Sequence, residues 1–132
     1  MRLRAGALGT LDAKPRRLAV ASASVAIDFE ALAEAVDAQL QAGGTPERAE
    51  KEKAYLKSEL LHYGTSVPAI RAVAKATARQ HPELTHDELV ALVDALWVVP
   101  VHERRMASVE LLDLYCDRLS PDDAALLERL LR

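Results

Sequence analysis

Aromatic residues, glycine and cysteine are scarce in this chain, whose 132 residues include five aromatics, five glycines and one cysteine. Strands favour β-branched and aromatic residues, so a half-apolar composition rich in alanine, leucine and valine favours helices instead. The lone Cys116 excludes an internal disulfide, and we expect it to be a small core residue of a cytoplasmic protein. No apolar run approaches the roughly 20 residues needed to cross a bilayer, which predicts a soluble chain.

The formal net charge of −3 argues against a nucleic-acid partner when taken alone, but the charge is unevenly distributed. Residues 44–82 carry seven basic and four acidic side chains, whereas residues 83–132 carry five basic and eleven acidic ones. Local potential, not the average, recruits a polyanion, so the basic middle segment is the place to look for one. Residues 1–27 predict a disordered or mispredicted leader, with a targeting peptide as the alternative, and residues 28–132 form the predicted helical domain.

Apolar residues at helical spacing, separated by capping signals, predict six helices. The Thr85-His86-Asp87-Glu88 run fits a capping box and is the clearest helix start in the chain. The residues expected on the apolar faces are Ala49, Leu56, Leu60 and Tyr63 in the second helix, Ile70, Val73, Ala74 and Thr77 in the third, and Leu89, Leu92, Val93 and Leu96 in the fourth. The fifth helix is expected to bury Met106, Val109, Leu112 and either Tyr115 or Cys116, and the sixth to carry Leu127, Leu130 and Leu131. The expected helices span about 29–41, 46–62, 67–80, 86–98, 101–119 and 121–132.

The helices are joined by short predicted connections, which implies antiparallel neighbours. Start signals at Thr45, Thr85 and Ser120 recur at a spacing close to that of HEAT-type arrays. We therefore predict an all-α fold of HEAT-like antiparallel helix pairs, a short right-handed α-solenoid, with a compact bundle as the alternative. The apolar last helix lacks a polar closing repeat, which predicts that further repeats or a partner protein cover it.

Signatures of metal and covalent chemistry are missing from the sequence. The four histidines lack ligand spacing, and one cysteine cannot form a thiolate site, so we predict no metal and no cofactor. Neither a phosphate-binding glycine loop nor a serine-hydrolase elbow occurs.

One surface feature of the third predicted helix points to a ligand. Arg71, Lys75 and Arg79 are four residues apart, so they form a basic ridge on one side of that helix. Lys57 could extend this ridge from the preceding helix. A ridge of this kind suits a phosphate backbone, although an ordinary solvated helix face looks the same.

Two segments resemble the DNA alkylation-repair glycosylases of the AlkD type. The first is YLKSELLHYGTSVPAIRAVAK, from Tyr55 to Lys75, preceded by PERAEKEKA, and the second is ELVALVDALWVVPVHERRMASVELLDLY, from Glu88 to Tyr115. Together they cover roughly residues 45–130 in the family's order. The resemblance implies a curved stack of HEAT-like helix pairs whose concave basic face holds alkylated duplex DNA and from which N3- or N7-alkylated purines are excised.

The resemblance also implies roles for individual residues. Tyr55 would lie near the DNA-facing cleft, and Arg71 and Lys75 would contact DNA. Trp97 would pack inside the domain, and His102 and Glu103 would begin a helix, with Glu103 at the positive end of its dipole.

The family's catalytic segment, a tryptophan pair followed by an aspartate, would come after the sixth helix. Asp113 lies on the fifth helix and is expected to be a solvated or packing residue. We therefore expect no catalytic residue in this chain and no activity from it alone. The competing hypotheses are a non-catalytic HEAT-like module that binds DNA or a protein, and a scaffold whose last helix recruits a partner.

Overall fold

The computed structural model describes residues 28–130, so the predicted leader and the last two residues lie outside the described part. Six α-helices and two short 3₁₀ turns make up the fold, and the described residues form no strand, which confirms the all-helical prediction. The helices are α1 (Phe29–Ala42), α2 (Pro46–Leu56), α3 (Val67–Gln80), α4 (His86–Trp97), α5 (His102–Leu114) and α6 (Ala124–Leu130). None of these helices is long and apolar enough to cross a bilayer.

Side-chain caps fix where the helices begin, largely as the sequence predicts. Asp28, Thr45 and Ser66 each accept a hydrogen bond from a backbone N–H of the first turn of α1, α2 and α3. The predicted capping box is present at α4, where the Thr85 side chain accepts from the Glu88 amide and the Glu88 carboxylate accepts from the Thr85 amide.

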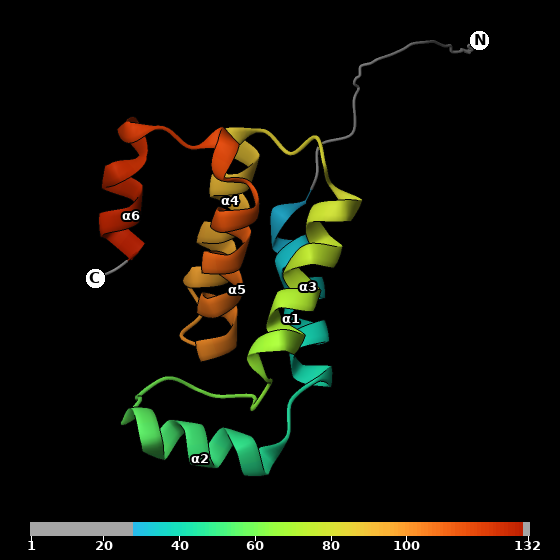
Figure 1. Ribbon diagram of the computed structural model, residues 1–132, viewed down its shortest axis with the longest axis vertical. Helices are drawn as coiled ribbons and strands as arrows, with labels where there is room; N and C mark the ends of the chain where they lie inside the picture. Colours follow the sequence, from blue (N-terminus) through green and yellow to red (C-terminus); the bar gives the residue numbers. More distant parts are fainter. Residues whose placement is uncertain (1–27, 131–132) are drawn as a thin grey trace, which may run out of the picture.

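The helices stack as two pairs, α1 with α3 and α4 with α5 (Figure 1). The first helices of the two pairs, α1 and α4, pack on each other, and so do the second helices, α3 and α5. α6 lies next to α4, where Arg129 forms an ion pair of 2.6 Å with Asp94. This arrangement is a helical repeat in two layers, with α1, α4 and α6 in one and α3 and α5 in the other.

The core lies between the two pairs, and α1, α4 and α5 each contribute several buried side chains to it. The four residues predicted to form the apolar face of α4 are all fully buried: Leu89, Leu92, Val93 and Leu96. α3 contributes Ile70, Ala74 and Thr77, as predicted, and the half-buried Trp97 packs against the core. Burial of these side chains is the main favourable term that holds the pairs together.

α2 departs most from the prediction. It ends at Leu56 and not at His62, because Lys57 takes the left-handed conformation with φ of 51° and closes the helix. No residue of α2 is buried, so the predicted apolar face is wrong as well. α2 lies across the end of the helix stack as an insertion within the first pair (Figure 1), and its start signal at Thr45 does not begin a repeat.

The segment from Leu61 to Thr65 cannot continue the helix, because its backbone pairs elsewhere. Leu61 pairs with Val101 in a parallel bridge, and Thr65 pairs with Gly44 in an antiparallel one. These pairings hold the segment extended, and helix periodicity alone does not reveal them.

The predictions for the last two helices need smaller corrections. α5 ends at Leu114, and a 3₁₀ turn from Cys116 to Arg118 follows it. Leu112 and Tyr115 are buried as predicted and Met106 packs against the core, whereas Val109 is exposed and Cys116 is exposed instead of in the core. The start of α5 also buries charged residues through polar contacts, whereas a periodicity argument places every charge outside. The buried residues of α5 are Glu103, Arg104, Ala107, Ser108, Leu111 and Leu112.

The sixth helix begins later than predicted. The Ser120-Pro121 signal opens a 3₁₀ turn, Pro121–Asp123, and α6 follows it directly. α6 buries Leu126 and Leu130, while Leu127, which we expected to be buried, is 40% exposed.

Candidate functional site

The predicted basic ridge forms on α3. Arg71, Lys75 and Arg79 are exposed, and they lie beside the face that buries Ile70 and Ala74 in the core. Three cations therefore follow one side of α3, in the same layer as α5.

The three cations of the ridge are not equally available. Arg71 Nε lies 3.3 Å from Glu110 Oε2 on α5, in a pair whose side chains are 58% and 21% exposed. Among the described residues, neither Lys75 nor Arg79 forms an ion pair, so these two positions carry the unneutralised charge of the ridge.

Tyr55 and Lys57 do not join the ridge. Tyr55 is 86% exposed on α2, and Lys57 is the exposed residue that ends this helix. Residues 57–66 form the connecting segment between α2 and α3. Figure 1 places the end of α2 away from α3, at the far end of this connecting segment. The structure thus brings together three of the four predicted DNA-binding residues and leaves Lys57, together with Tyr55 of the predicted DNA-facing cleft, on a separate element.

Glu103 holds that connecting segment against α5. Its side chain is fully buried, and Oε1 accepts a hydrogen bond from the Tyr63 amide at 2.9 Å. Oε2 accepts from the amides of Gly64 at 3.0 Å and Thr65 at 3.2 Å. The expected role at the start of a helix is therefore only part of its function, because Glu103 also orders the backbone that leads into α3.

A buried polar network joins α1, the connecting segment and α5. Asp37 accepts a hydrogen bond of 2.6 Å from the Tyr63 hydroxyl and pairs with Arg104 at 3.1 Å. Burial alone would raise the pKa of Asp37, but hydrogen bonds from Tyr63, Gln41 and Arg104 outweigh it and hold that pKa below its usual range. Burial and the bond to Asp37 raise the pKa of Tyr63 to about 12, so the phenol stays protonated.

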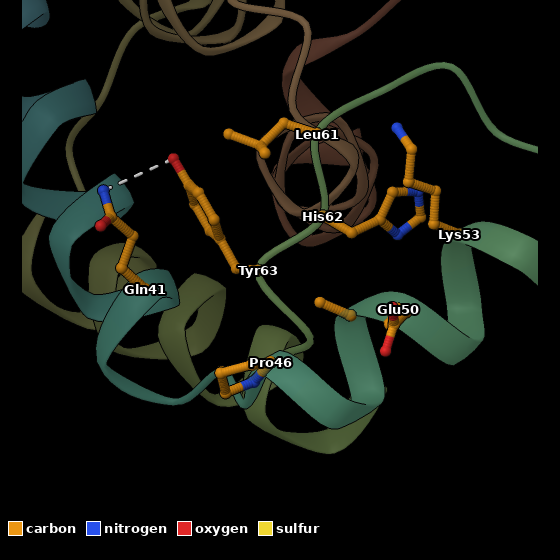
Figure 2. Close-up of a pocket in the computed structure, with 9 residues that line it drawn as sticks. Gln41, Pro46, Glu50, Lys53, Leu61, His62 and Tyr63 are labelled. Atoms are coloured by element: carbon orange, nitrogen blue, oxygen red, sulfur yellow. Dashed lines mark hydrogen bonds between the residues drawn. The ribbon is translucent and has the colours of Figure 1, made fainter.

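An open hollow of about 660 Å³ lies between α2 and the connecting segment. Figure 2 shows Tyr63 turned toward Gln41 on one side of this segment and His62 turned toward α2 on the other. Lys53 and Glu50 of α2 line the opposite wall. Tyr55 is not among the lining residues, so the hollow is distinct from the predicted DNA-facing position.

His62 and His102 form a cluster that spacing along the sequence does not predict. Their rings stack with centroids 4.4 Å apart and planes inclined by 11°, and Glu52 approaches from α2. Burial and the neighbouring His62 lower the pKa of His102. The two histidines are far apart in sequence, and only the backbone pairing of Leu61 with Val101 makes them neighbours.

The remaining residues singled out in the sequence are Trp97 and Asp113, and both lie in the settings expected for them. The Arg105 guanidinium lies 5.0 Å from the centre of the Trp97 ring, in a cation–π contact that agrees with the expected packing role. Asp113 is exposed on α5, as expected for a solvated carboxylate.

Comparison with models of known protein families identifies one that this chain matches. Residues 36–132 match the family model of the DNA alkylation repair enzymes, which is most of the chain and all of the helical stack beyond the first turns of α1. Searches of curated proteins and of solved structures give no significant match. A match over this length, on an all-helical repeat with an exposed basic ridge, shows that the chain belongs to the DNA alkylation repair enzyme family.

Proposed function

We propose that this chain binds alkylated duplex DNA through the ridge on α3, as the DNA-holding part of an AlkD-type glycosylase for N3- and N7-alkylpurines. Family membership supports a role in DNA repair. The observation that carries the proposal is the pair of exposed cations Lys75 and Arg79, which form no ion pair within residues 28–130, on a helix whose other face is fixed in the core. Cations on a rigid helix match a phosphate backbone without first having to be ordered.

We propose further that the 132-residue chain does not excise bases by itself. Loss of an alkylated purine leaves a cationic sugar, which a carboxylate in a dry, preorganised setting stabilises. Asp113 is solvated, and Trp97, the one tryptophan of the sequence, is covered by Arg105. These residues do not supply the carboxylate and flanking tryptophans that the resemblance implies for catalysis.

The salt dependence of DNA binding tests the ridge. Each phosphate contact that is removed should reduce the slope of log K against log salt by about 0.9. We expect Lys75→Ala and Arg79→Ala each to produce this change, and Arg71→Ala to produce less because Glu110 already neutralises Arg71. Glu110→Gln should raise the affinity by releasing Arg71.

The control removes a cation from the other layer. Arg129→Ala deletes an exposed arginine of α6 that is paired with Asp94, so it changes the net charge equally without touching the ridge. Equal losses of affinity in Arg129→Ala and Arg79→Ala would show a non-specific charge effect. Release of 7-methylguanine from methylated duplex DNA by the chain alone would overturn the non-catalytic part of the proposal.

A protein-binding module is the second candidate function. α2 has no buried residue, and three large apolar side chains are exposed on it or just after it: Tyr55, Leu56 and Leu61. A triple alanine variant of the ridge that keeps its full affinity for DNA would remove the ridge as a DNA site and favour this alternative.

A further inference from the structure

Three potential metal ligands from separate elements converge beside α2. Glu52 belongs to α2, His62 belongs to the connecting segment, and His102 is the first residue of α5. One ligand atom from each side chain lies within 4.8 Å of those of the other two. This cluster is not used by the proposed DNA site.

Three buried polar atoms of the cluster have no hydrogen-bond partner within residues 28–130. The His62 side chain is only 1% exposed, yet within the described part of the chain neither of its ring nitrogens has a hydrogen-bond partner. Glu52 Oε1 is also buried without a hydrogen bond, 3.5 Å from His62 Nδ1. Buried polar atoms without partners cost free energy, so a ligand that these atoms can bind would stabilise the fold.

The backbone fixes the two histidines as neighbours. The Leu61 amide donates to Pro100 O at 3.1 Å, and the His102 amide donates to Leu61 O at 2.9 Å. These two bonds tie the residue before His62 to the start of α5. The proximity of the rings is therefore built into the fold and does not depend on side-chain rotamers alone.

We propose that Glu52, His62 and His102 bind a divalent transition-metal ion, with Zn²⁺ as the best match. Two imidazoles and one carboxylate are a common zinc ligand set, and water completes the tetrahedron. Ligand atoms of such a site lie about 3.3 Å apart, given bonds of about 2.0 Å. The separation of 3.5 Å between His62 and Glu52 is already close to this value.

Binding requires one local rearrangement. An ion lies in the plane of each imidazole that it binds, and the two rings are nearly parallel, so one ring has to leave the stack. His102 is only half-buried and can turn about its Cβ–Cγ bond, whereas His62 is enclosed. His62 and Glu52 form the fixed part of the site, and His102 closes it.

The ion would attach α2 to the rest of the fold. α2 buries no side chain of its own, so few apolar contacts hold it. A ligand on α2, a second on the connecting segment and a third on α5 would replace the missing packing with coordination bonds. Metal binding would thus stabilise the position of α2, including Tyr55.

Competition between the untagged full-length chain and a chromophoric zinc chelator tests this site. All variants carry Cys116→Ser, because an exposed thiol is a competing zinc ligand. We expect one Zn²⁺ per chain and at least a tenfold loss of affinity in His62→Ala, His102→Ala and Glu52→Gln. His81→Ala is the control, since His81 lies outside the cluster, and it should bind Zn²⁺ as tightly as the parent.

Two further measurements keep the test decisive. Co²⁺ should give the visible absorption of a tetrahedral site in the parent and not in His102→Ala, a half-buried position where folding is expected to survive. Zn²⁺ should raise the thermal midpoint of the parent and leave that of His102→Ala unchanged. Absence of Zn²⁺ binding would overturn the proposal and leave a simple His62–Glu52 ion pair, and unchanged binding in the His102→Ala and Glu52→Gln variants would show an adventitious ion only.

Discussion

Replacing Glu103 by glutamine tests whether one buried carboxylate fixes the segment between α2 and α3. Glutamine keeps an oxygen toward Gly64 and Thr65 but places an NH₂ group against the Tyr63 amide. Hydrogen bonds to a charged acceptor contribute about 1.5–3 kcal/mol, neutral ones about 0.5–1.5, and a buried donor without a partner costs about 1–3. Two weakened bonds and one unsatisfied donor predict a destabilisation of about 3–6 kcal/mol.

Urea unfolding measures this loss, and Glu110→Gln provides the matched control. Glu110 has the same side chain on the same helix, but its partner Arg71 is 58% exposed, so removing its charge should cost no more than about 0.5 kcal/mol. Amide hydrogen exchange should also show that Thr65 loses protection in Glu103→Gln alone. A midpoint for Glu103→Gln within error of the Glu110→Gln midpoint would refute the reasoning.

Two further predictions concern the backbone and α6. Gly64→Ala should destabilise the fold by more than about 2 kcal/mol in thermal unfolding, because Gly64 has φ of 81° and an added Cβ would collide with Thr45 O. Gly43→Ala is the control and should be nearly neutral, since its added Cβ would have no contact shorter than 3.4 Å. Equal effects of the two substitutions on the thermal midpoint would contradict this prediction. The hydrogen bond of 2.6 Å that His86 Nε2 donates to Asp123 Oδ1 raises the pKa of His86 and lowers that of Asp123. The stabilisation from this pair is therefore largest above the unfolded pKa of Asp123, near 3.8, and below that of His86, near 6.5, and it is lost as pH rises through the raised pKa of His86. Hydrogen exchange of the α6 amides, corrected for the intrinsic pH dependence of exchange, should be faster at pH 8.5 than at pH 5.5. The His86→Gln variant should abolish that difference. Equal protection of α6 at both pH values in the parent would rule out this coupling.

The sequence predicted the fold best where local and tertiary preferences agree. α4 has a capping box at Thr85, and its four periodic apolar residues are the four that the core buries. Prediction failed at α2, where a strongly helical sequence continues beyond Leu56 but the chain pairs with the segment before α5. Neither a left-handed Lys57 nor that pairing has a local signal.

The basic ridge was predictable from the sequence alone, whereas its electrostatics were not. Spacing at four residues decides that Arg71, Lys75 and Arg79 share one side of a helix, because the helical repeat is a local property. The neutralisation of Arg71 depends on Glu110, a residue of another helix that only the packing of α3 on α5 brings within 3.3 Å.

The sequence by itself determined the class of the protein: its helices, most of their starts, the composition of the core of α4 and the resemblance to a repair family. These properties depend on neighbours along the chain, through caps, periodicity and motif order. The tertiary structure alone decided which polar residues are buried. Glu103 and Arg104 lie inside because partners from other segments bind them, and His62 lies inside beside His102 and Glu52 of two other elements. Burial of a charged or polar group depends on contacts between distant segments, which no local pattern in the sequence encodes.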